Sequence, residues 1–379
     1  MIKSKHLIIF GTRPEAIKMA PLVKEFQKYS EFETKVCVTA QHREMLDQVL
    51  DFFEIKPDYD LNLMKPNQNL FSLTADIITE LRTVMEDFNP DFVYVHGDTS
   101  TSTIAGLAAF YAGAKVCHVE AGLRTHNKWS PFPEEMNRQL TGRIADFHFA
   151  PTSQSKQNLL IENINEENIL VTGNTVIDAL LDSAERVTTI QNQEIEFLKT
   201  IVDTDKKLIL VTGHRRENHG QGFINICHAL KEIATINADV QIIYPVHLNP
   251  NVQKPVHEIL SGFDNIKLID PLSYPAFVWL MTKSYMIITD SGGVQEEAPS
   301  LGKPVLVMRD TTERPEAVEA GTVILVGTDK EKIVTEAQSL LTNPKRYQSM
   351  TGLHNPYGDG KACARVAEFI KKKQINKIH

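Results

Sequence analysis

The stretch of sequence that decides the fold is HLIIFGTRPE, residues 6–15. Its first half, His6–Phe10, is short and almost entirely apolar, which is typical of a strand buried on both faces of a parallel sheet. Its second half predicts a helix start, because Thr12 and Glu15 have the spacing of a capping box and Pro14 suits the first helical turn. A strand that leads directly into a capped helix predicts an α/β protein with parallel strands.

The predicted helix start is also a candidate anion site. Backbone N–H groups at a helix N-terminus attract anions, and Arg13 and Lys18 would add full positive charges beside them. The alternative is a purely structural cap with solvated basic side chains. The turn has neither the GxGxxG pattern of a dinucleotide site nor the GxxxxGK[ST] pattern of a P-loop, which argues against NAD and ATP.

Apolar strand-like runs alternate with amphipathic helical stretches along the rest of the chain. Further strands are predicted at Lys35–Thr39, Phe92–His96, Lys115–Val119, Lys207–Thr212, Val240–Val246, Ile266–Ile269, Met286–Thr289, Pro304–Met308 and Val323–Val326. Helical patterns occupy Ala16–Tyr29, Phe71–Asp87, Thr101–Ala112, Gln154–Glu166, part of Asp182–Asp205, and Lys361 to about Lys373. The pattern predicts two doubly wound halves with a cleft between them.

Composition limits the class of protein and its partners. The 379 residues correspond to roughly two domains, and the net charge of −8 argues against a nucleic-acid or anionic-membrane partner. The sequence shows neither a signal peptide nor an apolar run of membrane-spanning length, so we expect a cytoplasmic protein. The four cysteines lack CxxC spacing, and we expect buried free thiols rather than disulfides or a zinc site.

Four further polar motifs are placed where predicted strands end. They are Gly97-Asp98-Thr99, Glu120-Ala121-Gly122-Leu123-Arg124, Gly213-His214-Arg215-Arg216-Glu217-Asn218 and Asp290-Ser291-Gly292-Gly293. In open α/β sheets the carboxyl ends of the strands line the ligand crevice. Together with residues 11–15, these motifs predict a single active site in an enzyme whose ligand is an anionic nucleotide derivative.

Three carboxylates in these and neighbouring turns are candidates for moving a proton: Asp98, Glu120 and Glu134. Such chemistry needs a base and an acid of different effective pKa, and carboxylates in a partly desolvated cleft can be tuned in this way. Each of them could instead be a helix cap or an ion-pair partner, and this alternative is strongest for the adjacent Glu135.

The motifs of the second half provide candidate phosphate and ribose contacts. His214 could donate a hydrogen bond or a proton to a phosphate leaving group, although a surface-loop histidine is the alternative. His247 lies at another strand end and could face the same cleft. The Ser291-Gly292-Gly293 turn between strand and helix predicts a phosphate nest, or simply a tight turn, and a later acid could accept hydrogen bonds from a ribose diol. The histidines lack metal-ligand spacing, so no catalytic metal is expected.

With Thr312-Glu313-Arg314-Pro315-Glu316 and Asn355-Pro356-Tyr357-Gly358 added, at least seven motifs match one family in order and spacing over nearly the whole chain. The sequence closely resembles the non-hydrolysing bacterial UDP-N-acetylglucosamine 2-epimerases. The resemblance implies a GT-B fold, with a Rossmann-like domain at 1–172, a UDP-binding Rossmann-like domain at 173–360, and a C-terminal helix at about 361–379 that joins the first domain. It also implies a homodimer that needs no redox cofactor and supplies a surface polysaccharide pathway, which no residue identifies further.

The resemblance also implies the reaction and the roles of individual residues. UDP-N-acetylglucosamine and UDP-N-acetylmannosamine would interconvert by loss of UDP to 2-acetamidoglucal and its re-addition. Asp98, Glu120, Glu134 and His214 match the catalytic positions, without showing which carboxylate is the base. The substrate-binding positions are matched by Arg13, Lys18, Phe277, Ser291, Gly292, Gly293, Glu296 or Glu297, and Arg314.

Family members can bind a second UDP-N-acetylglucosamine as an activator, and this region is matched by Gln41, His42, Arg215, His247 and also Glu134. The chain has Glu44 where some members carry Gln, and Asn67 where some carry Arg. A lost cation and an added anion weaken diphosphate binding, so we expect weaker activation by substrate.

Two other classes of protein would share part of this pattern. A GT-B glycosyltransferase would use the same UDP subsite but would need an acceptor groove, for which the sequence shows no hydrophobic or basic patch. A nucleotide-sugar sensor would need the anion sites but not three cleft carboxylates. A hydrolysing 2-epimerase is a closer variant, disfavoured only by the resemblance.

Overall fold

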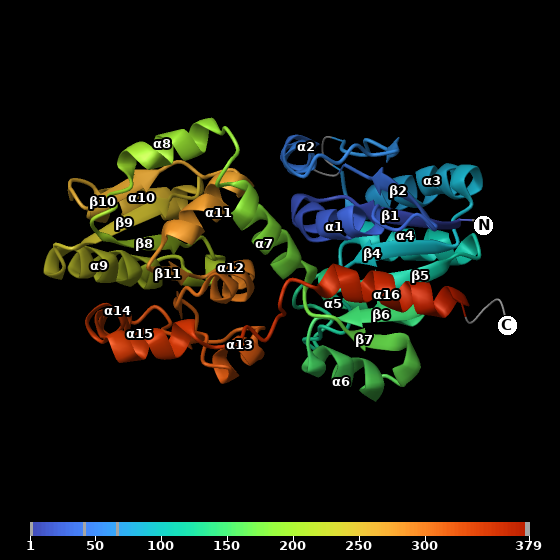
Figure 1. The fold of residues 1–379 in the computed structure, drawn as a ribbon. Coiled ribbons are helices and arrows are strands. Elements are labelled where there is room, and N and C mark those ends of the chain that lie inside the picture. The colour runs from blue at the N-terminus through green and yellow to red at the C-terminus, as the bar shows by residue number, and fades with distance from the viewer. Residues whose placement is uncertain (1–2, 41–42, 66–67, 376–379) are drawn as a thin grey trace. The chain divides into compact units, whose positions relative to one another are not determined.

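The computed structural model describes residues 3–40, 43–65 and 68–375. The chain divides into two compact units, Met1–Ala179 with Tyr357–His379, and Leu180–Pro356. Each unit contains one parallel sheet with helices packed on it, shown in Figure 1. The α/β prediction is therefore confirmed, and so are the parallel, doubly wound halves.

The sheet of the first unit has the strand order β3-β2-β1-β4-β5-β6-β7. Its strands are β1 (Ser4–Phe10), β2 (Phe32–Val38), β3 (Tyr59–Asp60), β4 (Phe92–His96), β5 (Lys115–Val119), β6 (Phe147–Ala150) and β7 (Ile169–Val171). All neighbouring strands are parallel. Because the order reverses between β1 and β4, the loops after these two strands flank the crevice where ligands bind in such sheets.

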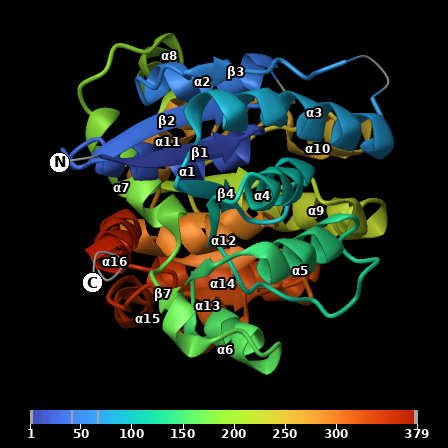
Figure 2. The same cartoon turned by 90° about the vertical axis from the view of Figure 1, so that its right-hand side faces the viewer.

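Helices cover both faces of this sheet. They are α1 (Arg13–Phe26), α2 (Arg43–Phe52), α3 (Leu70–Phe88), α4 (Ser100–Tyr111), α5 (Glu134–Ile144), α6 (Ser153–Ile161) and α16 (Ala362–Ile375), with α7 (Thr175–Arg186) starting in this unit. Figure 2 shows α4 between α3 and α5, with which it packs. The red C-terminal helix α16 packs on α1 in Figure 1. Leu7 and Ile9 of β1 point to the α3–α4 face, as alternate strand residues do.

The sheet of the second unit repeats the topology, in the order β10-β9-β8-β11-β12-β13. Its strands are β8 (Lys207–Thr212), β9 (Val240–Pro245), β10 (Ile266–Ile269), β11 (Met286–Thr289), β12 (Val305–Val307) and β13 (Val323–Leu325). The reversal lies between β8 and β11. The helices are α8 (Gln193–Ile201), α9 (Gln221–Ile236), α10 (Pro250–Leu260), α11 (Tyr274–Lys283), α12 (Gly292–Glu297), α13 (Pro315–Glu319), α14 (Lys330–Thr342) and α15 (Pro344–Thr351).

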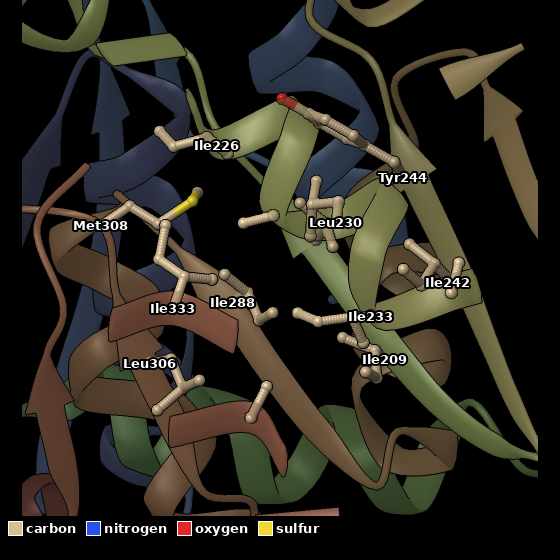
Figure 3. Packing of buried hydrophobic residues seen from close by; sticks show 14 of the residues in the cluster. Ile209, Ile226, Leu230, Ile233, Ile242, Tyr244, Ile288, Leu306, Met308 and Ile333 are labelled. Carbon is tan, nitrogen blue, oxygen red and sulfur yellow. The ribbon is translucent and has the colours of Figure 1, made fainter. Parts of the chain in front are cut away.

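An apolar core packs the second sheet against its helices. Figure 3 shows Leu230 and Ile233 of α9 packed against Ile209 of β8 and Ile242 of β9, and all four side chains are fully buried. Burial of one such aliphatic side chain contributes about 1.5–3 kcal/mol. This packing holds the strand ends in place, and with them the loops that carry the motifs.

The sequence-based elements agree best in the strands. Phe92–His96, Lys115–Val119, Lys207–Thr212, Ile266–Ile269 and Met286–Thr289 have the predicted bounds. The sequence pattern missed α2, β3, α5, β6 and β7. The junction Asp182–Asp205 holds the end of α7 and then α8 as a separate helix. All four cysteines are buried free thiols, as expected. Within the described ranges, no helix is both long and apolar enough to cross a bilayer.

Candidate functional site

The start of α1 lies at the switch point of the first sheet, and its predicted capping box is confirmed. The Glu15 N–H donates to Thr12 Oγ1, and Glu15 Oε2 accepts from the N–H groups of Gly11 and Thr12 at 3.0 and 2.8 Å. Glu15 Oε1 accepts from the hydroxyls of Thr99 and Ser102 at 2.6 and 3.0 Å. Burial raises the pKa of Glu15, while these donors oppose the shift. One buried carboxyl group thus ties the start of α1 to the start of α4.

Glu120 follows β5 and is the centre of a polar cluster. Its backbone is left-handed, with φ of 61°, and its side chain is 9% exposed. The carboxylate forms an ion pair with Lys18 of α1 and accepts from Asn174 Nδ2 at 2.8 Å. The ring of His96, at the end of β4, approaches the same carboxylate oxygen to 3.7 Å through Nε2. Lys18, which the sequence assigned to the phosphate site, therefore lies against a candidate catalytic carboxylate.

Two buried histidines beside this cluster are neutral at ordinary pH. Burial lowers the pKa of His96 to about 4 and that of His118 to about 3. The His118 Nε2–H donates to the carbonyl oxygen of Gly97 at 2.7 Å. Because Gly97 precedes Asp98 in the loop after β4, this hydrogen bond supports the loop that carries the second carboxylate.

Asp98 lies next to Glu120 but has a different partner. Its carboxylate forms an ion pair with Arg138 of α5, and its carbonyl oxygen accepts from Asn137 Nδ2 at 2.9 Å. Burial raises the pKa of Asp98; Arg138 opposes this effect, and the charge of Glu120 adds to it. Two neighbouring carboxylates thus sit in unequal surroundings, the arrangement that separates an acid from a base.

The adjacent glutamates of α5 differ in environment. Glu135 is fully buried and accepts from the N–H groups of Thr125 and His126 at 3.0 and 3.1 Å. Burial alone would raise the pKa of Glu135, but these donors and Arg138 leave it below its ordinary value. Glu135 is therefore structural, as expected. Glu134 is half-buried and lies one turn before Arg138, on the helix face that reaches Asp98.

In the second unit, Asp290 organises the loop after β8. This carboxylate is fully buried, and its Oδ2 accepts from the N–H groups of His214 and Arg215, both at 2.8 Å. Its Oδ1 lies 3.7 Å from His214 Nδ1. The ring of His214 stacks on that of His247 with centroids 5.1 Å apart. Burial lowers the pKa of His247, and the neighbouring His214 contributes to the shift. The structure thus brings His214, Arg215 and His247 together.

The Ser-Gly-Gly turn after β11 leads directly into α12. The Ser291 N–H donates to Thr289 Oγ1 at 2.9 Å. The guanidinium of Arg314 lies over the turn, since a Cβ added to Gly292 would be 3.3 Å from Arg314 Cζ. Arg314 also donates through Nε to Glu296 at 2.7 Å. A fixed positive charge therefore stands beside this turn, and a side chain at position 292 would press against it.

The remaining predicted site residues are placed as follows. Arg13 opens α1, Phe277 is half-buried on α11, Gly293 is exposed, and Glu297 is buried on α12. Glu44 is exposed in the first turn of α2, whereas Gln41, His42 and Asn67 lie outside the described residues. In the described part of the chain, no group of three or more His, Cys, Asp or Glu side chains is arranged to hold a metal ion.

Sequence reasoning missed the residues that hold the candidate groups. Asp290 belongs to one of the polar motifs and Asn174 to none of them, and nothing in the sequence pointed to their partners 76 and 54 positions away. Arg138 and His96 carried no sequence signal, because each acts through a contact between separate elements.

Comparisons with known proteins agree with this arrangement. The family model described as UDP-N-acetylglucosamine 2-epimerase matches residues 24–371. The UDP-N-acetylglucosamine 2-epimerase of Escherichia coli K12 is 59% identical over 374 residues, which cover 98% of this chain and 100% of that protein.

Solved structures give the same result. The Neisseria meningitidis UDP-GlcNAc 2-epimerase bound to UDP-GlcNAc superposes with a TM-score of 0.88 at 54% identity, covering 97% of this chain and 100% of that chain. The Methanocaldococcus jannaschii UDP-GlcNAc 2-epimerase in complex with UDP-GlcNAc and UDP gives a TM-score of 0.78 at 35% identity, covering 97% and 99%. The fold is GT-B-like, as the resemblance implied. Since sequence and structure agree along nearly the whole length, the chain belongs to the UDP-N-acetylglucosamine 2-epimerase family.

Proposed function

We propose that this protein interconverts UDP-N-acetylglucosamine and UDP-N-acetylmannosamine as a non-hydrolysing 2-epimerase. The observation that carries the proposal is the pair of neighbouring carboxylates, Asp98 and Glu120, each joined to a cation at the carboxyl ends of β4 and β5. Full-length similarity to 2-epimerases supports the same activity. No redox cofactor is part of the proposal.

The proposed reaction proceeds by elimination and re-addition. A carboxylate takes the proton from C-2 while the bond between C-1 and the diphosphate oxygen breaks, and UDP leaves with the electron pair. The product is 2-acetamidoglucal, with a double bond between C-1 and C-2. A proton then returns to C-2 on the opposite face as a UDP oxygen bonds to C-1. Asp98 and Glu120, with Glu134 on the adjacent helix, are the groups that we propose move this proton.

Departure of the diphosphate must be strongly assisted, because the C-2 proton is not beside a carbonyl group. We propose that Arg13, Lys18 and Arg314 stabilise the negative charge that develops on UDP. We assign His214, held by Asp290, as a donor to the diphosphate. We propose that Glu297 or Glu296 accepts from the ribose; Glu296 also forms an ion pair with Arg314.

These roles define the proposed domains. Residues 1–172, with the helix at about 361–379, supply the carboxylates. Residues 173–360 bind UDP through Ser291, Gly292 and Gly293, with Phe277 near the uracil.

Activation by a second substrate molecule is proposed to involve Gln41, His42, Arg215, His247 and Glu134. Glu44 and Asn67 should make it weaker than in relatives with Gln and Arg at these positions. Strongly sigmoidal UDP-N-acetylmannosamine kinetics, fully relieved by a trace of UDP-N-acetylglucosamine, would contradict this expectation.

We also propose that the protein is a homodimer. The face formed by α3 and α4 carries Phe110 and Tyr111, which are 61% and 71% exposed, beside a hollow of about 440 Å³. Exposed aromatic side chains of this kind are enriched in protein interfaces. Light scattering should give twice the mass of one chain for the unmodified protein, and the mass of a single chain for Tyr111→Glu. A single-chain mass for the unmodified protein would reject the dimer.

The cytoplasmic location stays a prediction.

The decisive experiment is proton NMR of the purified protein with UDP-N-acetylglucosamine in deuterated water. We expect UDP-N-acetylmannosamine signals together with solvent deuterium at C-2. Free N-acetylmannosamine and UDP would instead identify a hydrolysing enzyme. An unchanged spectrum with retained binding would favour a transferase without its acceptor or a sensor. Asp98→Asn and Glu120→Gln should abolish the deuterium exchange if these carboxylates move the proton.

A further inference from the structure

The side-chain amide of Asn174 donates to the carboxylate of Glu120, and a second hydrogen bond sets the orientation of this amide. Asn174 is 2% exposed, and its Oδ1 accepts from the N–H of Val176 at 3.1 Å. This bond places the amide oxygen toward α7 and turns the amino group toward Glu120, where Nδ2 donates at 2.8 Å. A flipped amide would lose both hydrogen bonds, so the donor faces the carboxylate in a single orientation.

The backbone of Asn174 is held by the segment that returns from the second unit. The Asn174 N–H donates to the carbonyl oxygen of Tyr357 at 2.7 Å. Next to this bond, Gly173 and Gly358 meet backbone to backbone, and a Cβ added to Gly173 would lie 3.2 Å from Gly358 Cα. Both glycines have positive φ, 86° and 130°, so a side chain at either position would be strained as well as crowded.

These contacts lie where the chain passes between its two units. The unit boundaries fall after Ala179 and after Pro356, a few residues beyond Asn174 and directly before Tyr357. The outgoing and returning segments therefore touch at Asn174, within the first unit. The same residue donates to a carboxylate of the proposed active site.

We propose that Asn174 is a positioning residue. It links the carboxylate of Glu120 to the place where the outgoing segment at Gly173–Asn174 meets the returning segment at Tyr357–Gly358. The assignment rests on the proposed function, in which Glu120 moves the C-2 proton. Asn174 does not touch the reacting atoms. It donates to Glu120 Oε2 at 2.8 Å, and a hydrogen-bond donor favours the ionised form of a carboxylate. Glu120 can take up its working geometry only when the Gly173–Gly358 junction is intact.

The alternative is that Asn174 only stabilises the fold. Asn158 is a matched control, because its Nδ2 donates at 2.9 Å to the carbonyl oxygen of Gly122, two residues after Glu120. Asn158 therefore supports the same loop through the backbone without contacting a carboxylate. Loss of either amide should destabilise the loop, but only loss of Asn174 should alter the chemistry of Glu120.

The test compares Asn174→Ala, Asn174→Asp and Asn158→Ala with the unmodified protein, by kcat, KM and C-2 deuterium exchange. We expect Asn174→Ala to lower kcat roughly 10- to 100-fold with little change in KM, because the lost donor acts on the ionised carboxylate during proton transfer. The acid limb of its kcat–pH profile should move to higher pH. Asn174→Asp, which places an anion against Glu120, should lose more activity. Asn158→Ala should keep kcat within about threefold.

The outcomes separate this proposal from the proposed function. An unmodified protein without C-2 exchange would overturn both. An active unmodified protein whose Asn174→Ala variant keeps its kcat and pH profile would overturn the positioning role alone, as would equal losses in Asn174→Ala and Asn158→Ala. If Asn174→Ala does not fold, the test uses the nearly isosteric variant Asn174→Asp instead. An unchanged kcat in that variant would overturn the positioning role of Asn174.

Discussion

At the scale of single residues, the site depends on neighbouring carboxylates that are held differently. Asp98 has a raised pKa because it is buried beside Glu120, and Arg138 opposes that rise. Glu120 is held by Lys18 and Asn174. Small changes in Arg138 or Asn174 should therefore change the pH dependence of the enzyme more than its affinity for the UDP-sugar.

Arg138→Gln tests this dependence. Loss of the guanidinium removes the charge that opposes burial, so the pKa of Asp98 should rise further. The limb of the kcat/KM–pH profile that reports the ionisation of Asp98 should then move to higher pH. Arg138→Lys keeps the charge and should leave the limb near its original position. An unmoved limb in Arg138→Gln would show that Arg138 does not set the ionisation of Asp98.

The sequence allows the candidate site residues to be placed at strand ends, but it does not reveal the residues that contact them. Asp98, Glu120 and His214 follow strands that a short apolar run makes visible, and the position of such loops is set by topology. Their partners Asn174, Arg138 and Asp290 are visible only once the chain has folded, because each contact joins separate elements. The contact between Glu296 and Arg314, 18 residues later, is likewise visible only in the folded chain.

At the scale of elements, the side chain of Glu15 links the start of α1 to the start of α4. Glu15 accepts from two backbone N–H groups before α1 and from the hydroxyls of Thr99 and Ser102 at the start of α4. Both helices begin at the switch point and determine where Lys18 and Asp98 lie. The cap is therefore part of the site's geometry as well as of its stability.

Glu15→Ala should lower the free energy of unfolding by roughly 2 to 4 kcal/mol, because two buried backbone donors lose their acceptor. Thr12→Ala should cost about 1 kcal/mol, as an ordinary cap does. Denaturant titration measures both, with exposed Lys28→Ala as a control expected within about 0.5 kcal/mol of the unmodified protein. Equal losses in Glu15→Ala and Thr12→Ala would show that the link to α4 contributes nothing.

There are physical reasons why the sequence pattern missed some of the elements. β3 has two residues and β7 has three, too few to show a period. The helix α5 begins after two prolines and carries polar residues on most of its surface, because its partners are Asp98 and other polar groups. Its pattern therefore does not resemble that of a helix on an apolar core.

At the scale of the whole molecule, buried histidines are concentrated in the first unit. Burial lowers the pKa of His6 and His118 to about 3, and that of His96 and His148 to about 4. In the unfolded chain these four histidine side chains become protonated near pH 6.5, whereas in the folded unit they become protonated only at much lower pH. The stability that they contribute is complete above about pH 6.5 and is lost as the pH falls toward about 4 for His96 and His148, and toward about 3 for His6 and His118.

We therefore expect the first unit to lose stability in mild acid more steeply than the second. Each histidine adds a slope of up to about 1.4 kcal/mol per pH unit. Peptide-level hydrogen exchange, corrected for its intrinsic pH dependence, should show protection falling first in residues of the first sheet. His6→Gln should flatten the slope, and exposed His257→Gln should not change it. Parallel loss of protection in both units would contradict the expectation.

The return of the chain to its first unit has a consequence for its synthesis. The helix α16 packs on α1, its Phe369 contacts Phe149 of β6, and Asp178 accepts from the N–H groups of Ala362 and Cys363. The second unit is one continuous segment, whereas the first unit is built from residues 1–179 and 357–379 and can be completed only after the last residues have been translated. A product truncated before α16 would therefore lack part of the first unit, the unit that carries Asp98 and Glu120.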